Sequence, residues 1–405
     1  AKAVVLEGFL DNFLVIKTLA QILIRIGQYS ESITLLEQCK VIAKGQIAEL
    51  HSLIARAQLH DMSLKKSFEN YSFAIDLNPR NPQFYTGRAH ASVLTPLHQQ
   101  ARKDFVTAQN IILKRTGENN YALGDYYGQL LNEMQANPSA LKVIEKVFEQ
   151  PSIPAYINLI KQEPNYTPGH ASLLMLARNS GYFSNKNKII AECKIPKNIF
   201  QFWDTDELPD DIAYLSSSWK QKHPNWKYHC FNEKQAIRFL AASFHKSVVT
   251  AFVQAPQAAM KSDLFRLAAL YHHGGIYADA DDLCIKNLEP LFSSGKSLYL
   301  YQEYVGSVGN NFIAVKDKHP VIAAALQEAV TNILDNALDY VWLATGPGLI
   351  TRKFSQFFVS SILRTNNTEG DWHILTVEEL HEFSLIHCNV DYKRTEQHWI
   401  KAKVS

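Results

Sequence analysis

Residues 262–281 read SDLFRLAALYHHGGIYADAD, and this stretch decides how the second half of the chain is interpreted. Apolar residues recur at helical spacing, and two glycines then stop the helix, because glycine adopts the positive φ angles that such a turn needs. The following residues alternate as in a β-strand, which directs Tyr277, Asp279 and Asp281 to one face. The sequence therefore predicts a helix over 257–273 and then a strand carrying two carboxylates at a fixed place.

Carboxylates so placed suit a hard divalent cation, Mg2+ or Mn2+, which also binds the two phosphates of a nucleotide diphosphate. Such a cation stabilises the charge that develops on the leaving oxygen when a glycosidic bond breaks. A bare Asp-x-Asp is also common at an acidic, solvated strand end. The helix and double glycine in front of Asp279 and Asp281 favour the metal site.

Four segments resemble one known family, the DXD-containing sugar-binding region glycosyltransferases, which include yeast-type initiating mannosyltransferases, animal α-1,4-galactosyltransferases and, more distantly, glucosylating bacterial toxins. The segments stand in the family's order: IPKNIFQFW at 195–203, HPNWKY at 223–228, SDxxR at 262–266 and GxYxDxD at 275–281. The resemblance covers about residues 195–400. It implies an α/β domain of the GT-A (Rossmann-like) fold, with the nucleotide at the carboxyl ends of its strands, and retention of configuration at the anomeric carbon.

The resemblance also implies a donor site, made of Trp203, Gln201, Ser262, Asp263, Arg266, Tyr277 and Asp279. Trp203 would lie against the nucleotide base, since an indole at the end of a buried strand can stack on it. Asp263 and Arg266 would hold the donor's sugar, with Tyr277 beside them. The alternatives are a tryptophan that fills the core and a surface ion pair worth about 0.2 to 0.5 kcal/mol.

By the same resemblance, Asp279 would contact the ribose and metal-bound water, and Asp281 would ligate the metal directly. Asp263 and Arg266 complete the expected catalytic set. We predict His387 as a third metal ligand, because imidazole can join two carboxylates around Mn2+; the alternative is a partly buried histidine without such a role. His398-Trp399 resembles the family's closing Ser-Trp only loosely.

Two further segments match weaker features of the family near the donor and acceptor pocket. They are NNFIA at 310–314 and TGPG at 345–348. Both are also typical of ordinary loops.

The first half of the chain shows an internal repeat with the spacing of tetratricopeptide units. A small residue, a large residue four positions on and a third after three more recur in three copies: Ser32, Leu36 and Cys39; Ser67, Tyr71 and Ala74; Ala101, Phe105 and Ala108. Ala140, Ile144 and Val147 fit a degenerate fourth copy. The pattern predicts an α-helical solenoid that docks an acceptor or partner or associates with itself, and the alternative is a generic helical bundle. We expect repeats over 1–150, a helical connector over 151–194 and the transferase domain over 195–405.

The composition of the chain limits the number of domains and the classes of protein to be considered. The 405 residues suffice for two or three domains, and a net charge of +2 without a dense basic run argues against nucleic-acid binding. Five scattered cysteines without a C-x-x-C pair are typical of a reducing compartment, and no apolar run is long enough for a transmembrane segment. We expect a cytoplasmic protein, free or peripheral at a membrane, although the chain starts without methionine and a targeting segment before Ala1 stays open.

These observations predict a metal-dependent retaining hexosyltransferase. Its donor would be a UDP-sugar or, second in order, GDP-mannose, and its acceptor a glycan or a protein. One alternative is a non-catalytic repeat adaptor with a degenerate transferase domain, against which the intact acids argue. Another is a phosphodiesterase, which would need a larger cluster of acids and histidines for two metals.

Overall fold

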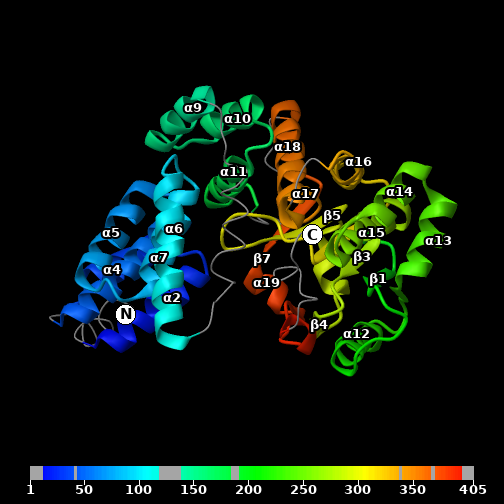
Figure 1. The fold of residues 1–405 in the computed structure, drawn as a ribbon, viewed down its shortest axis with the longest axis horizontal. Coiled ribbons are helices and arrows are strands. Elements are labelled where there is room, and N and C mark those ends of the chain that lie inside the picture. Colours follow the sequence, from blue (N-terminus) through cyan, green and yellow to red (C-terminus); the bar gives the residue numbers. More distant parts are fainter. Residues whose placement is uncertain are drawn as a thin grey trace. The chain divides into compact units, whose positions relative to one another are not determined.

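The computed structural model describes residues 12–40, 43–117, 138–183, 191–336, 340–365 and 370–394. The chain divides into two compact units, Ala1–Ser180 and Gly181–Ser405 (Figure 1). The connector and boundary that the sequence predicted fall partly on residues 184–190, which lie outside this description. His398 and Trp399 lie outside it as well.

The first unit is helical throughout its described part. Its helices are α2 (Phe13–Arg25), α3 (Tyr29–Glu37), α4 (Lys44–His60), α5 (Leu64–Leu77), α6 (Pro82–Val93), α7 (His98–Thr116), α9 (Pro138–Glu149), α10 (Ile153–Gln162) and α11 (Thr167–Asn179). Helices adjacent in sequence from α2 to α7 pack on one another. Asn81 and Pro82 show why one of them begins where it does: the Asn81 side chain caps Gln83 N, and proline fits the first turn because it lacks an N–H.

The repeated small residues make the same contact in two places. Ser32 Oγ donates a 3.1 Å hydrogen bond to Ala20 O, and Ser67 Oγ donates one of 2.7 Å to Ala55 O, in each case twelve residues back on the preceding helix. Both serines are fully buried, as small residues at a close helix–helix approach are. The helical units are therefore similar locally, and the tetratricopeptide solenoid stays a prediction.

The second unit contains a six-stranded mixed sheet, with the order β2-β1-β3-β6-β5-β7. The strands are β1 (Asn198–Phe202), β2 (Lys227–Phe231), β3 (Gly275–Ala278), β5 (Leu298–Gln302), β6 (Phe312–Val315) and β7 (Trp372–Thr376). β6 runs antiparallel to both of its neighbours, and the other pairings are parallel. A separate pair joins β4 (Leu283–Cys284) to β8 (Ser384–Leu385). The predicted α/β class of this half is confirmed as a helix-rich α/β unit with a mixed sheet.

Helices and short 3-10 turns complete this unit (Figure 1). They are α12 (Asp210–Lys222), α13 (Glu233–Ser243), α14 (Lys246–Gln254), α15 (Ala258–His273), η2 (Glu289–Ser294), α16 (Pro320–Leu334), α17 (Val341–Ala344), α18 (Pro347–Thr365), α19 (Val377–His381) and η3 (Asp391–Arg394). Fully buried Ile199, Ile276 and Phe312 form part of the sheet core. Within the described ranges, no helix combines the length and the apolar character that a membrane crossing needs.

The glycine turn between α15 and β3 forms as the sequence predicts. Gly274 and Gly275 have φ angles of +61° and +113°. A Cβ at Gly275 would lie 2.5 Å from Asn198 O, so glycine lets β3 approach β1 closely.

The predicted length of the strand is wrong, because β3 ends at Ala278 rather than continuing to Asp281. Asp279 N still donates to Asn311 O at 3.0 Å, but Asp279 O accepts from Asp282 N at 3.1 Å, which closes a turn. The carboxylates of Asp279 and Asp281 are therefore placed by a turn and not by strand alternation.

The loops that carry the predicted site residues lie at one edge of the sheet. β1, β2, β3, β5 and β7 all run in the same direction, so their carboxyl ends share this edge, and antiparallel β6 begins there. Trp203 follows β1 and Asp279 follows β3, while Asn310 and Asn311 precede β6. Ligands of open α/β sheets bind at such an edge.

Candidate active site

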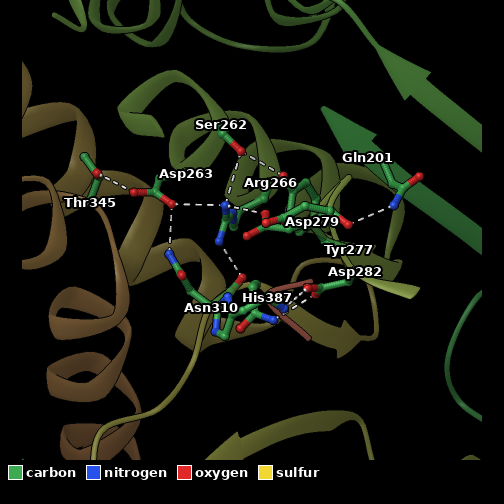
Figure 2. A network of polar contacts seen from close by, with 12 residues as sticks. Gln201, Ser262, Asp263, Arg266, Tyr277, Asp279, Asp282, Asn310, Thr345 and His387 are labelled. Atoms are coloured by element: carbon green, nitrogen blue, oxygen red, sulfur yellow. Dashed lines mark hydrogen bonds and ion pairs between the residues drawn. The ribbon is translucent and has the colours of Figure 1, made fainter. Parts of the chain in front are cut away.

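Arg266, on α15, is the centre of a buried polar network (Figure 2). Its Nη2 lies 2.9 Å from Asp279 Oδ1, 3.2 Å from Asp263 Oδ1 and 3.2 Å from Ser262 Oγ. Its Nη1 donates a 2.6 Å hydrogen bond to Asn310 O. The guanidinium thus joins the helix to the turn after β3 and to the segment before β6.

Asp263 is bonded to the protein through both carboxylate oxygens. Oδ1 accepts from Asn310 Nδ2 at 2.9 Å, and Oδ2 accepts from Thr345 Oγ1 at 2.7 Å. Burial raises the pKa of Asp263 to about 6, while Arg266 and Thr345 act in the opposite direction. The side chains of Asp263 and Arg266 are only 6% and 5% exposed, so the alternative of a surface ion pair is wrong.

Tyr277, on β3, supports the guanidinium from the sheet. Arg266 Cζ lies 4.5 Å from the centre of its ring, within the range of a cation–π contact. The Tyr277 hydroxyl lies 2.8 Å from Ser262 Oγ. Burial is the main cause that raises the pKa of Tyr277. The hydroxyl therefore stays protonated, and the side chain is neutral in these contacts.

Gln201 fixes the main chain of the acidic turn to β1. This fully buried amide donates from Nε2 to Asp279 O at 3.0 Å and accepts from Tyr228 Oη at 2.7 Å. Its contact is therefore with the backbone that presents the Asp279 carboxylate.

The three acids of the turn differ in their surroundings. Asp279 has a side chain that is 27% exposed, whereas Asp281 and Asp282 are buried. Burial is the main cause that raises the pKa of Asp279; Arg266 lowers it, and the charge of Asp281 raises it again. Burial, then Asp281 and Asp279, raise the pKa of Asp282 well above its usual range.

Asp282 bonds to the segments that carry Asn311 and His387 rather than facing solvent. Its carboxylate accepts from Asn311 Nδ2 at 2.8 Å and from the main-chain N of His387 at 2.8 Å. His387 follows β8 with a φ of +56°, and its charge lowers the pKa of Asp279. The sequence shows the acid at position 282 but gives no sign of these partners.

Asp281 and Trp203, the predicted metal and base residues, both contact the C-terminal turn η3. Lys393 Nζ forms an ion pair with Asp281 Oδ2, and Tyr392 Oη donates to the same oxygen at 3.2 Å. The rings of Tyr392 and Trp203 meet edge to face, with centroids 5.3 Å apart. Trp203 is partly buried and packs against an apolar cluster that includes Ala280, so its stacking on a base stays a prediction.

The acidic turn fits a divalent cation in part. Asp281 already attracts a positive charge, that of Lys393, and repulsion between the acids would be relieved by a cation. Within the part of the chain that the structure describes, however, no three His, Cys, Asp or Glu side chains form a ready ligand set. The acids therefore need oxygen ligands from a substrate or water to complete a coordination shell.

Comparison with known proteins finds a family that one segment of the chain matches. Residues 209–298 match the family described as glycosyltransferase sugar-binding region containing DXD motif. This range includes Asp263, Arg266, Asp279 and Asp281, and excludes Trp203. The chain is thus related to DXD-motif glycosyltransferases.

Similar proteins include two from Schizosaccharomyces pombe. Inositol phosphoceramide mannosyltransferase 1 is 26% identical over 176 residues, 41% of this chain and 53% of that protein. Inositol phosphoceramide mannosyltransferase 2 is 29% identical over 168 residues, 40% of this chain and 46% of that protein. The match thus spans about half the length of each. A solved structure, PaToxG Glycosyltransferase, matches with a TM-score of 0.36 and 19% identity over 62% of this chain and 95% of that one.

Proposed function

We propose that this protein is a metal-dependent retaining glycosyltransferase that moves a hexose from a nucleotide diphosphate sugar to a glycan or protein acceptor. The observation that carries the proposal is the Arg266 network, which fixes Asp263 and Asp279 at the carboxyl edge of the sheet beside Asp281. A buried ion network at that edge, within the segment that matches the family, favours an intact site over a degenerate one.

The order of the candidate donors differs from the expectation based on the sequence, which placed a UDP-sugar first. Both yeast proteins above are named mannosyltransferases. We therefore put GDP-mannose first among the donors to be tested and keep UDP-sugars as the second group.

In the proposed mechanism, Asp279 and Asp281 would hold a divalent cation, with His387 as the candidate third ligand. When bound, the cation supplies charge neutralisation of the departing diphosphate. Arg266 positions Asp279, since its Nη atoms are committed to protein oxygens. The exposed part of the Asp279 carboxylate then faces the donor.

For the donor's sugar and base we propose the surfaces nearest this network. Asp263 would contact the sugar, Arg266 would hold Asp263 in place for it, and Trp203 would take the base. We assign no nucleophile, and expect attack on the same face of the sugar from which the diphosphate leaves.

The helical unit would dock the acceptor or a protein partner. The repeated contacts of Ser32 and Ser67 support a repeat architecture, and stacked helical repeats bind peptides and proteins along an extended surface. In this proposal the unit serves recognition and not chemistry.

The test is a donor panel. Purified protein with Mn2+ is incubated with GDP-mannose and a set of UDP-sugars, and free nucleotide diphosphate is followed. We expect release from one donor, and none from Asp281→Asn, which removes a charge at almost constant volume. Glu289→Gln, at the opposite edge of the sheet beside Lys197, is the matched control and should keep the wild-type rate. No release from any donor would leave the adaptor as the better explanation.

A further inference from the structure

The C-terminal turn η3, Asp391–Arg394, covers two predicted donor subsites with two adjacent side chains. Lys393 pairs with Asp281, the predicted metal ligand, and Tyr392 lies against Trp203, the predicted base platform. Nothing in the resemblance or in the comparisons assigns a role to either residue. Both contacts come from one short element, so movement of that element as a unit would free both subsites together.

The described residues show several contacts that hold the turn. Asp391 N donates to Asp211 Oδ2 at 2.9 Å, which ties the turn to α12. Lys393 Nζ also donates to Cys388 O at 2.9 Å. The Tyr392 ring packs with Trp203 in a small apolar cluster apart from the sheet core. A short turn that packs outside the sheet core opens at lower cost than the sheet itself.

We propose that this turn is an internal occupant of the donor site: Lys393 stands at Asp281 in place of a divalent cation, and binding of the cation with a nucleoside diphosphate displaces the turn. The inference rests on the proposed function, since it deepens the account of the same site. In this proposal one positive charge replaces another beside a single oxygen, Asp281 Oδ2. Asp281 Oδ2 accepts from Tyr392 and pairs with Lys393, so a cation that ligates this oxygen must expel the ammonium beside it.

Displacement at Asp281 also frees Trp203. In this proposal the whole turn moves rather than the Lys393 side chain alone, so the Tyr392 ring leaves Trp203 together with the ammonium. A cation therefore opens the base platform before or while the nucleotide binds. Cation and nucleotide should bind with positive coupling, each removing the same competitor.

The first experiment measures binding of Mn2+ alone, by electron paramagnetic resonance of the free ion. In Lys393→Met we expect the Kd for Mn2+ to fall about fivefold or more, the lower end of ordinary coupling between sites. Lys197→Met is the matched control: it removes an exposed lysine that pairs with Glu289 at the far edge of the sheet, and should bind as wild type does. Equal or weaker Mn2+ binding by Lys393→Met overturns the proposal.

The second experiment needs no variant and so does not depend on the folding of one. Hydrogen–deuterium exchange of wild-type residues 388–394 is followed with no ligand, with Mn2+, and with Mn2+ plus GDP or UDP. Exchange should increase on adding Mn2+ and increase further with the nucleotide. Unchanged or slower exchange in this segment, with Mn2+ bound, contradicts displacement.

The inference and the proposed function can fail separately. If wild type releases nucleotide diphosphate from a donor but Lys393→Met binds Mn2+ no more tightly, only the internal occupant is refuted. If Mn2+ frees the turn but no donor in the panel is cleaved, only the transferase is refuted. If Mn2+ binds neither protein, both are.

Discussion

Gln201 Nε2 donates a 3.0 Å hydrogen bond to the main-chain oxygen of Asp279, joining the end of β1 to the first residue after β3. The other end of the amide accepts from Tyr228 on β2. Three neighbouring strands thus fix the acidic turn through one buried side chain. The position of the Asp279 carboxylate depends on this amide as well as on Arg266.

Replacing Gln201 with leucine should loosen the acidic turn. The change removes the Gln201 bonds to Asp279 O, which keeps its bond from Asp282 N, and to the Tyr228 hydroxyl, and the loss of a hydrogen bond costs about 0.5–1.5 kcal/mol of unfolding free energy. We expect that loss in urea unfolding, with reduced turnover on the active donor. Tyr228→Phe is the control, since it keeps the bond to Asp279. Equal turnover in the two variants would remove Gln201 from the positioning of the acid.

Gly275 should not tolerate a side chain. Its φ is +113° and a Cβ at this position would lie 2.5 Å from the Asn198 oxygen, so Gly275→Ala must shift β3 away from β1. We expect a loss of several kcal/mol or insoluble protein, measured by expression and thermal unfolding. Gly45→Ala, in α4 where a Cβ meets nothing within 4 Å, should be neutral or stabilising by about 0.5–1 kcal/mol. Similar stability in the two variants would contradict this account of the glycine turn.

Asp263 and Arg266 should be energetically coupled. Arg266→Met leaves buried Asp263 without its charge partner, and breaking a buried pair costs about 3–5 kcal/mol. Adding Asp263→Asn removes the stranded charge, so the double variant should lose less than the sum of the two single variants. Urea unfolding of the three variants measures the coupling. Additive losses would show that the two charges do not depend on each other.

His319 should make the second unit sensitive to acid. Its Nδ1 accepts a 3.2 Å hydrogen bond from Val321 N and so caps α16. Burial lowers the pKa of His319 from 6.5 to about 4. Between these values the unfolded chain binds more protons than the folded one, so the free energy of unfolding falls as pH falls through this window.

The matched variant is His319→Asn, which keeps a capping acceptor and does not titrate. Lowering the pH from 7 to 5 should cost wild type up to about 2 kcal/mol more than it costs this variant. Urea unfolding at the two pH values gives the difference. The same pH dependence in both proteins would assign the acid sensitivity to other groups.

The local sequence pattern was sufficient to predict several elements of the second unit. The helix α15, the glycine turn and the strand after it follow from apolar spacing and from the two residues able to take positive φ. Trp203 falls directly after β1, where the end of the apolar run places it. The error in the length of β3 arose because alternation continues in the sequence beyond Ala278, while the bond from Asp282 N to Asp279 O closes a turn that no pattern marks.

The sequence by itself determined which residues supply the carboxylates after the helix and the glycines, because their spacing acts over a few neighbouring positions. Only the tertiary structure decided what those acids meet. Thr345 reaches Asp263 from 82 residues away and Tyr392 reaches Asp281 from 111, and contacts between such distant segments leave no periodic trace in a single chain. The β4–β8 pair brings the segment of Tyr392 to Asp281, and the packing of α16 on α15 and on α17 brings Thr345 to Asp263.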